Sequence, residues 1–175
     1  RVDGRRRGVT DHQRDCCAQV NARTMIKLTR TDSGNPDFAM LVGLLDADLA
    51  QRDGSEHAFY HQFNKIDRIK HAIVAYENNK PVGCGAMKEY ASEIMEIKRM
   101  YALPESRGRG IATQVLAELE SWAVELRYKR CLLETGKKQP EAIALYEKNG
   151  YTRTENYGQY IGIENSVCFE KKLAL

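Results

Sequence analysis

The chain has 175 residues, of which 42% are hydrophobic and 29% charged, a size and composition that fit one domain with a substantial core. No apolar run reaches the length of a membrane span and no secretory signal is visible, so we expect a cytoplasmic protein without a membrane partner. The formal net charge is +3, and residues 1–24 alone hold six Arg and three Asp. The remaining residues are therefore neutral overall, which does not favour a nucleic-acid partner.

The first 24 residues lack apolar periodicity, whereas Met25 opens the strand-like segment MIKLT. We interpret residues 1–24 as an extension added in expression or translation, or as a disordered leader, and residues 25–175 as a single domain. The alternative for the leader is a functional basic arm.

The cysteines and histidines do not predict a metal site. Five cysteines, an odd number, show no metal-ligand spacing and are expected to be free thiols in a reducing compartment. His57 and His61 are four residues apart, but the sequence fixes no third ligand. The cysteines are Cys16, Cys17, Cys84, Cys131 and Cys168.

The first predicted elements are a short strand over 26–29 and a helix over about 37–52. Turn and cap residues precede the helix, and Gly54 follows it as a stop signal. Apolar residues recur at helical spacing, which predicts the face that packs on the core. These residues are Phe38, Leu41, Leu44, Leu45 and Leu49. The next segment, HAFYHQFNKI, fits a second short helix.

Three strands follow in the pattern, with the sequences HAIVAYE, PVGCGAMKEY and EIMEIKRMYAL. A tight turn, NNK, joins the first two. In the third strand, over 93–103, simple alternation places Ile94, Glu96, Lys98 and Met100 on one side. A bulge would change that register.

Helices and strands alternate in the C-terminal half. A strongly amphipathic helix follows residue 112, and the short apolar strand over 131–134 is typical of one buried inside a sheet. The segment QPEAIALYEKNG predicts a helix with Pro140 in its first turn and Gly150 just past its end, and SVCFEKKL predicts a closing strand. This order predicts an α+β fold with helices on the faces of a mixed sheet.

The stretch YALPESRGRGIA leads from the third of these strands into the amphipathic helix. Gly108 and Gly110 permit positive φ and leave backbone amides unobstructed. The first turn of the helix adds unpaired N–H groups and the positive end of the helix dipole. Together they predict a cradle for an anion, most often a phosphate, and Arg107 and Arg109 add positive charge.

Two other phosphate-binding loops do not fit this stretch. The P-loop pattern is absent, and G-x-G-x-x-G fails because residue 113 is Thr. The run RGRGIA (107–112) is instead similar to the R/Q-x-x-G-x-G/A signature of the GNAT superfamily of acyl-CoA-dependent N-acetyltransferases. The longer segments KRMYALPESRGRGIATQVL and EAIALYEKNGY also resemble the family's strand–loop–helix unit and its later helix. The resemblance covers about residues 25–173.

The resemblance implies an α+β fold with a mixed, mostly antiparallel central sheet of six to seven strands and helices on both faces. It implies that loop amides bind the pyrophosphate of coenzyme A, and that the fourth strand splays from the fifth to admit the pantetheine arm. Gln139 stands near the position where many members have Asn beside the pantetheine. The positions that match the cofactor-binding segments are Arg107, Gly108, Arg109, Gly110, Ile111, Ala112 and Thr113 in the loop and Met100, Tyr101 and Ala102 in the strand.

Two residues match catalytic positions of the family. Tyr146 matches a tyrosine that protonates the leaving thiolate, a role that suits a phenol with a pKa of about 10; packing on the sheet is the alternative. Glu96 roughly matches the family's general base, with Glu93 or a water chain as alternatives. An ion pair of Glu96 with Lys98 or a solvated strand face is the structural alternative.

We therefore expect an N-acetyltransferase that transfers acetyl from acetyl-CoA to a primary amine by direct attack, without a covalent acyl-enzyme. The amine belongs to a small molecule, an amino acid or a peptide, and the protein is expected to be a monomer or homodimer. A non-catalytic module that binds CoA or acyl-CoA is the alternative function. Tyr157 and Tyr160 either contact the acceptor or are ordinary aromatic residues of a surface loop.

Overall fold

The structure is a computed structural model that describes residues 25–54 and 69–174. The leader, the predicted second helix and the His57 and His61 pair lie outside the described residues. The chain begins with β1 (Ile26–Thr31), α1 (Pro36–Asp53), β2 (His71–Glu77), β3 (Lys80–Ala91) and β4 (Ile94–Ala102). After η2 (Pro104–Ser106), it continues with α3 (Ile111–Glu125), β5 (Arg130–Gly136), α4 (Pro140–Lys148), β6 (Thr152–Thr154), η3 (Gly158–Tyr160) and β7 (Ser166–Lys172).

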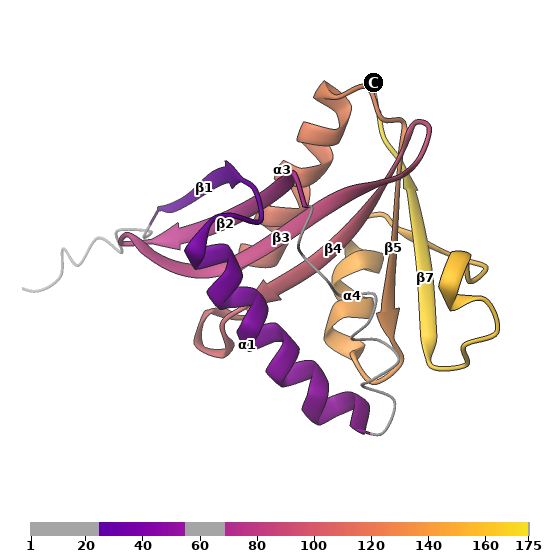
Figure 1. Cartoon of the computed structure of the whole chain (residues 1–175), viewed down its shortest axis with the longest axis horizontal. Coiled ribbons are helices and arrows are strands. Elements are labelled where there is room, and N and C mark those ends of the chain that lie inside the picture. The colour runs from indigo at the N-terminus through magenta and orange to yellow at the C-terminus, as the bar shows by residue number, and fades with distance from the viewer. Residues whose placement is uncertain (1–24, 55–68, 175) are drawn as a thin grey trace, which may run out of the picture.

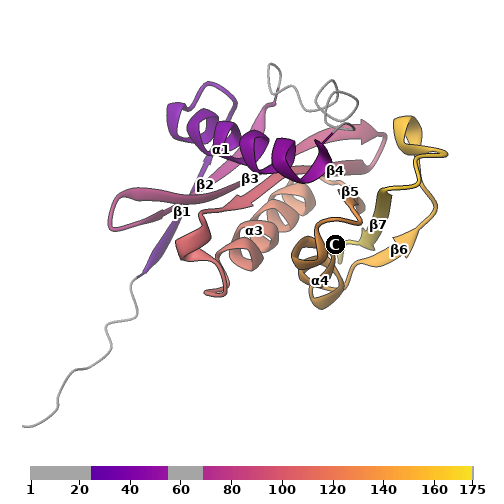
Figure 2. The same ribbon diagram turned by 90° about the horizontal axis from the view of Figure 1, so that it is seen from below.

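Within the described residues, seven strands form one twisted sheet in the order β1-β2-β3-β4-β5-β7-β6. Among these neighbours β4 and β5 are parallel, and every other pair is antiparallel. Helix α1 crosses one face of the sheet, whereas α3 and α4 cover the other (Figures 1 and 2). The predicted α+β fold, with a mixed and mostly antiparallel sheet and helices on both faces, is therefore confirmed.

Helix α1 has the cap and stop signals that the sequence predicts. The Asn35 side chain accepts hydrogen bonds from the backbone N–H groups of Asp37 and Phe38, at 2.9 and 3.1 Å, and Gly54 ends the helix at a φ of 57°. The prediction that Leu44 faces the core is wrong, because its side chain is 42% exposed. Val42 is buried in its place, since it shares a helix face with Phe38.

A β-bulge in β4 sets which side chains reach each face of the sheet. Lys98 pairs with Ala86 and Tyr101 with Cys84, so two residues of β4 stand opposite the single residue between them in β3. Arg99 occupies the bulge with a φ of 60°.

The bulge moves Met100 to the α3 face. There its sulfur would lie 2.5 Å from a Cβ placed on Gly85, whereas Lys98 lies on the α1 face with its partner Ala86. The simple alternation that put Met100 on the side of Glu96 and Lys98 is therefore wrong.

The parallel pair opens into a fork. Strand β4 pairs with β5 only over Ile94–Ile97 and Arg130–Leu133, yet both strands continue beyond these residues, to Ala102 and Gly136. Backbone groups past the last pair have no ladder partner across the gap, so this is where the sheet can receive a bound molecule.

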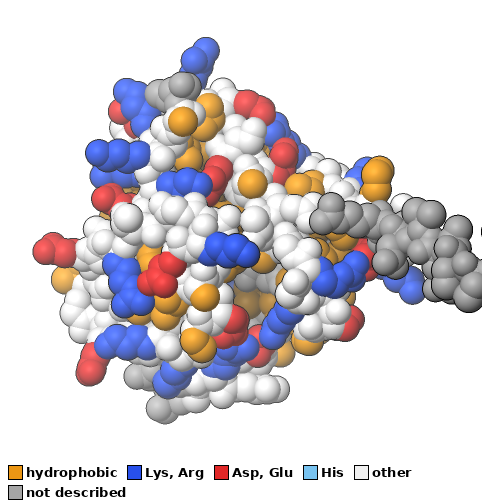
Figure 3. All heavy atoms as spheres, turned by 180° about the vertical axis from the view of Figure 1, so that it is seen from behind, with side chains coloured by type: hydrophobic (Ala, Val, Ile, Leu, Met, Phe, Trp, Pro, Cys, Tyr) orange, Lys and Arg blue, Asp and Glu red, His pale blue; other side chains and the backbone are white. Residues whose placement is uncertain are grey.

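Among the described residues, no helix has both the length and the apolar character that a bilayer crossing requires. On the face seen from behind, basic and acidic side chains are interspersed across the described surface (Figure 3).

Candidate active site

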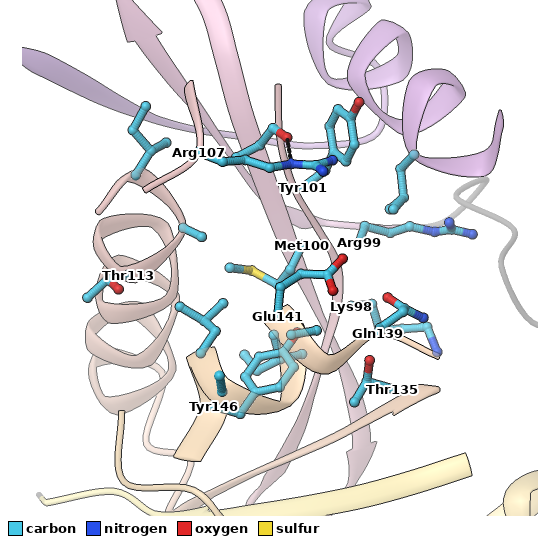
Figure 4. Close-up of a pocket in the computed structure, with 18 of the residues that line it drawn as sticks. Lys98, Arg99, Met100, Tyr101, Arg107, Thr113, Thr135, Gln139, Glu141 and Tyr146 are labelled. Carbon is cyan, nitrogen blue, oxygen red and sulfur yellow. Dashed lines mark hydrogen bonds between the residues drawn. The ribbon is translucent and has the colours of Figure 1, made fainter. Parts of the chain in front are cut away.

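A cavity of about 450 Å³ lies where β4 and β5 diverge. Residues from α1, the loop before α3, the start of α3, the end of β5 and α4 also line it. Figure 4 shows Thr113 on α3 at one side, Thr135 and Gln139 at the other, and Met100 between them. The cavity therefore joins the glycine-rich loop to the fork in the sheet.

The loop before α3 has the geometry of an anion cradle. Gly108 and Gly110 have φ values of 74° and 79°, a region that favours glycine, and a Cβ on either would meet no atom within 4 Å. Gly110 is the N-cap of α3, and no side chain caps this end. The backbone amides of the first turn, over 111–113, belong to residues that line the cavity and have no helical carbonyl to bond.

The two arginines of the loop point in different directions. Arg107 lines the cavity, donates from Nε to the carbonyl of Ala102 at 3.1 Å and lies over the ring of Tyr101 (Figure 4). Arg109 instead forms a bidentate ion pair with Glu77 and is absent from the cavity wall. Of these two loop arginines, Arg107 is the one whose guanidinium can add charge to the cavity.

The floor of the cavity is the part of β4 that has no β5 partner. Met100, Tyr101 and Ala102, the strand positions that the family resemblance assigns to the cofactor arm, all border it. Gln139 lies across the gap, where its carbonyl accepts the first hydrogen bonds of α4. The predicted cofactor residues other than Arg109 therefore surround one space.

Tyr146 of α4 lines the same cavity with a side chain that is only 5% exposed. Its ring packs on Tyr151 and Phe169, with centroids 5.8 and 6.0 Å away. Burial raises the pKa of the Tyr146 phenol, and the charge of Glu134 adds to the effect. The hydroxyl therefore remains protonated at neutral pH and can act as a donor.

Glu96 lies at the other end of the cavity and is 7% exposed. Its Oε1 accepts a hydrogen bond from the Tyr157 hydroxyl at 3.0 Å, and its Oε2 lies 3.2 Å from Lys98 Nζ. Glu93 sits in the turn before β4, pairs with Lys129 and does not border the cavity. Of the two predicted carboxylates, only Glu96 is in reach of a molecule in the cavity.

The two tyrosines that the sequence offers as acceptor contacts differ in position. Tyr160 is buried and lines the cavity, whereas Tyr157 reaches Glu96 from outside the cavity wall. The structure also adds lining residues that the sequence did not indicate, namely Asp48, Thr135 and Glu141. Thr135 was missed because the predicted strand ends at residue 134, whereas β5 runs on to Gly136. Asp48 was missed because the prediction for α1 considered only its apolar face. Among the described residues, no three acidic, His or Cys side chains form a metal-binding group.

Sequence comparison agrees with this geometry. Residues 39–151 match the model of the acetyltransferase (GNAT) family. The chain belongs to the GNAT family. It is thus an acetyltransferase, and the matched region contains the loop, β4, Tyr146 and the fork of the sheet.

One relative by sequence and two solved structures illustrate what this GNAT domain is similar to. An uncharacterized N-acetyltransferase, YsnE of Bacillus subtilis, is 37% identical over 101 residues, which are 57% of this chain and 67% of that protein. A crystal structure from Klebsiella pneumoniae, provisionally named an acyl-CoA N-acyltransferase, is 28% identical with a TM-score of 0.73, covering 86% of this chain and 99% of the other. A crystal structure of a GNAT acetyltransferase from Elizabethkingia anophelis with acetyl-CoA bound is 19% identical with a TM-score of 0.62. The match covers 85% of this chain and 98% of the other.

Proposed function

We propose that this acetyltransferase transfers the acetyl group of acetyl-CoA to a primary amine by direct attack within a ternary complex. The observation that carries the proposal is the single cavity that runs from the α3 amides, through the fork of β4 and β5, to the carboxylate of Glu96. A related fold holds acetyl-CoA, which supports acetyl-CoA as the cosubstrate.

The loop would bind the pyrophosphate of acetyl-CoA. Free amides at a helix N-terminus and two glycines in the left-handed region present donors to an anion without side-chain obstruction. Arg107 adds a guanidinium on the cavity side. Arg109 contributes its backbone in this proposal, because its side chain is engaged by Glu77.

The pantetheine arm would lie in the fork, beside the backbone of Met100, Tyr101 and Ala102. These residues border the cavity and lie past the last β4–β5 pair. Strand N–H and C=O groups there can bond the amides of the arm and orient the thioester, and a strand amide can stabilise the oxyanion. Gln139, at the start of α4, borders the same space.

Proton transfers complete the reaction at the two ends of the thioester. A lysine-like amine has a pKa of about 10.4 and is largely protonated at neutral pH, so Glu96 would take its proton, directly or through one water. The amine nitrogen then bonds to the thioester carbon and the carbon–sulfur bond breaks. Tyr146 would donate its proton toward the leaving sulfur and regain one from water.

The proposal is tested by mixing the purified protein with acetyl-CoA and a panel of amines, which includes small amines, amino acids and peptides. We expect amine-dependent release of free thiol together with an N-acetylated product in mass spectrometry. Tight CoA binding with no amine-dependent thiol release across the panel would instead favour a non-catalytic CoA-binding module.

A further inference from the structure

The hydroxyl of Tyr157 meets the carboxylate of Glu96 across a long separation in sequence. Tyr157 lies in the segment between β6 and η3, and its hydroxyl donates to Glu96 Oε1 at 3.0 Å. Lys98 occupies the other carboxylate oxygen at 3.2 Å. The carboxylate is therefore held by two donors, one from β4 and one from the segment between β6 and η3.

The segment that carries Tyr157 is fixed before any ligand arrives. The side-chain amide of Asn156 donates to three backbone carbonyls, those of Tyr160, Ile163 and Ser166, at 3.1, 3.0 and 3.4 Å. These contacts tie together the chain between β6 and β7. They hold the backbone next to Tyr157, so its side chain starts from a defined position.

The ring of Tyr157 is also clamped. It packs edge-on against Tyr90 at 5.1 Å and against Tyr160 at 5.6 Å, between ring centroids. A ring held on both sides loses little further entropy when its hydroxyl bonds to Glu96. This arrangement is typical of a residue that positions another one.

Glu96 needs a defined orientation if it is to accept a proton from the acceptor amine. The carboxylate is nearly buried on the cavity wall. Hydrogen bonds from fixed donors hold it in one orientation there. Because an ionised carboxylate offers about four lone-pair sites, two donors leave room for the amine or for a bridging water.

The other titratable groups around Glu96 come from four neighbouring elements and include Glu134 of β5, which acts on Tyr160 and Cys168 as Glu96 does. Lys88 of β3 is its cross-strand partner, and Tyr160 of η3 and Cys168 of β7 interact with it electrostatically. Burial raises the pKa values of Tyr157 and Tyr160, and it raises the pKa of Cys168 to about 11. At neutral pH the tyrosines and the cysteine in this set are therefore uncharged.

We propose that Tyr157 is a positioning residue that orients the Glu96 carboxylate for the acceptor amine. This inference rests on the proposed function, in which Glu96 is the base. It assigns a defined task to the segment between β6 and β7, for which the sequence leaves open either direct acceptor contact or the role of an ordinary surface loop.

A direct titration tests the contact without turnover. Glutamate labelled with ¹³C in the side-chain carboxyl would be incorporated, and the Glu96 signal identified by its loss in Glu96→Gln. In Tyr157→Phe, which keeps the packed ring, we expect the titration midpoint of Glu96 to rise by about one to two pH units, the value of one hydrogen bond to a charged group. Tyr90→Phe is the matched control and should leave the midpoint in place. An unchanged midpoint in folded Tyr157→Phe overturns the inference.

The pH dependence of turnover tests the catalytic consequence. In Tyr157→Phe the low-pH limb of the kcat profile should move upward with the Glu96 midpoint, and in a Glu96→Gln background the same change should have no further effect on kcat. A midpoint that moves without any movement of the limb overturns both the base role of Glu96 and the inference. If no amine releases thiol at any pH, the proposed function fails, while the titration still reports whether Tyr157 controls Glu96.

Discussion

Arg107 in the loop before α3 forms an ion pair with Asp48 of α1, with Nη2 3.3 Å from Oδ2. Asp48 also bonds Arg52 one turn later, and Arg52 pairs with Glu141 in the first turn of α4. Helix α1 is thus linked by charge to both walls of the cavity. The same arrangement makes Asp48 a competitor for the guanidinium that we assign to the cofactor.

Arg107→Gln should weaken CoA binding about tenfold, because it removes the one loop guanidinium on the cavity side. Arg109→Gln is the matched control and should change the dissociation constant less than threefold, since its side chain is paired with Glu77. Isothermal titration calorimetry with CoA measures both. Equal losses in the two variants would contradict the distinction between the arginines.

Gly110→Asp should raise the dissociation constant for CoA at least tenfold more than Gly110→Asn does. Both substitutions place a side chain of similar size at a φ of 79°, a region that Asn and Asp tolerate better than other residues. Only the aspartate brings a negative charge to the helix N-terminus. The pair of variants separates charge from backbone strain, and equal affinities would argue against a phosphate at this loop.

Tyr146→Phe should lower kcat about 100-fold while changing the apparent acetyl-CoA constant little. The phenylalanine keeps the packing on Tyr151 and Phe169, so the thermal unfolding temperature should remain close to that of the unaltered protein. Steady-state kinetics with a saturating amine would measure the effect. Full turnover in this variant would reduce Tyr146 to a packing role.

Gly85→Ala should destabilise the fold by about 1–3 kcal/mol, the range for overpacking in a core. A Cβ there would lie 2.5 Å from Met100 Sδ and 2.7 Å from Val115 Cγ1. Gly43→Ala in α1 is the control: its Cβ meets nothing within 4 Å, and alanine is the better helix former by about 1 kcal/mol. Urea unfolding should therefore shift in opposite directions for the two variants.

The sequence was sufficient for those parts of the site that depend on local backbone requirements. Gly108 and Gly110 permit positive φ at a turn between a strand and a helix, and the amphipathic pattern after them predicts a helix start with free amides. Tyr146 became a candidate through the family resemblance, and its position in the cavity follows from α4 packing on the sheet. In these cases a short segment of sequence is enough to predict the local structure.

Other parts of the site depend on contacts between distant segments and were not predictable in the same way. The bulge at Arg99 arises from pairing with β3, so the sequence could suggest it but not locate it. Tyr157 reaches Glu96 only because β6 and β7 lie beside β5 in the sheet. Leu44 was assigned to the core since hydrophobicity alone does not fix the exact rotation of a helix.

The divergence of β4 from β5 has a consequence for how this protein can change. The proposed contacts with the cofactor are made mostly by main-chain groups. The side chains at these positions can therefore be substituted as long as the backbone path is retained. The proposed contacts with the amine are made by individual side chains such as Glu96, Lys98 and Tyr160. Substitutions of these side chains can change which amine is accepted, while the acyl donor stays the same.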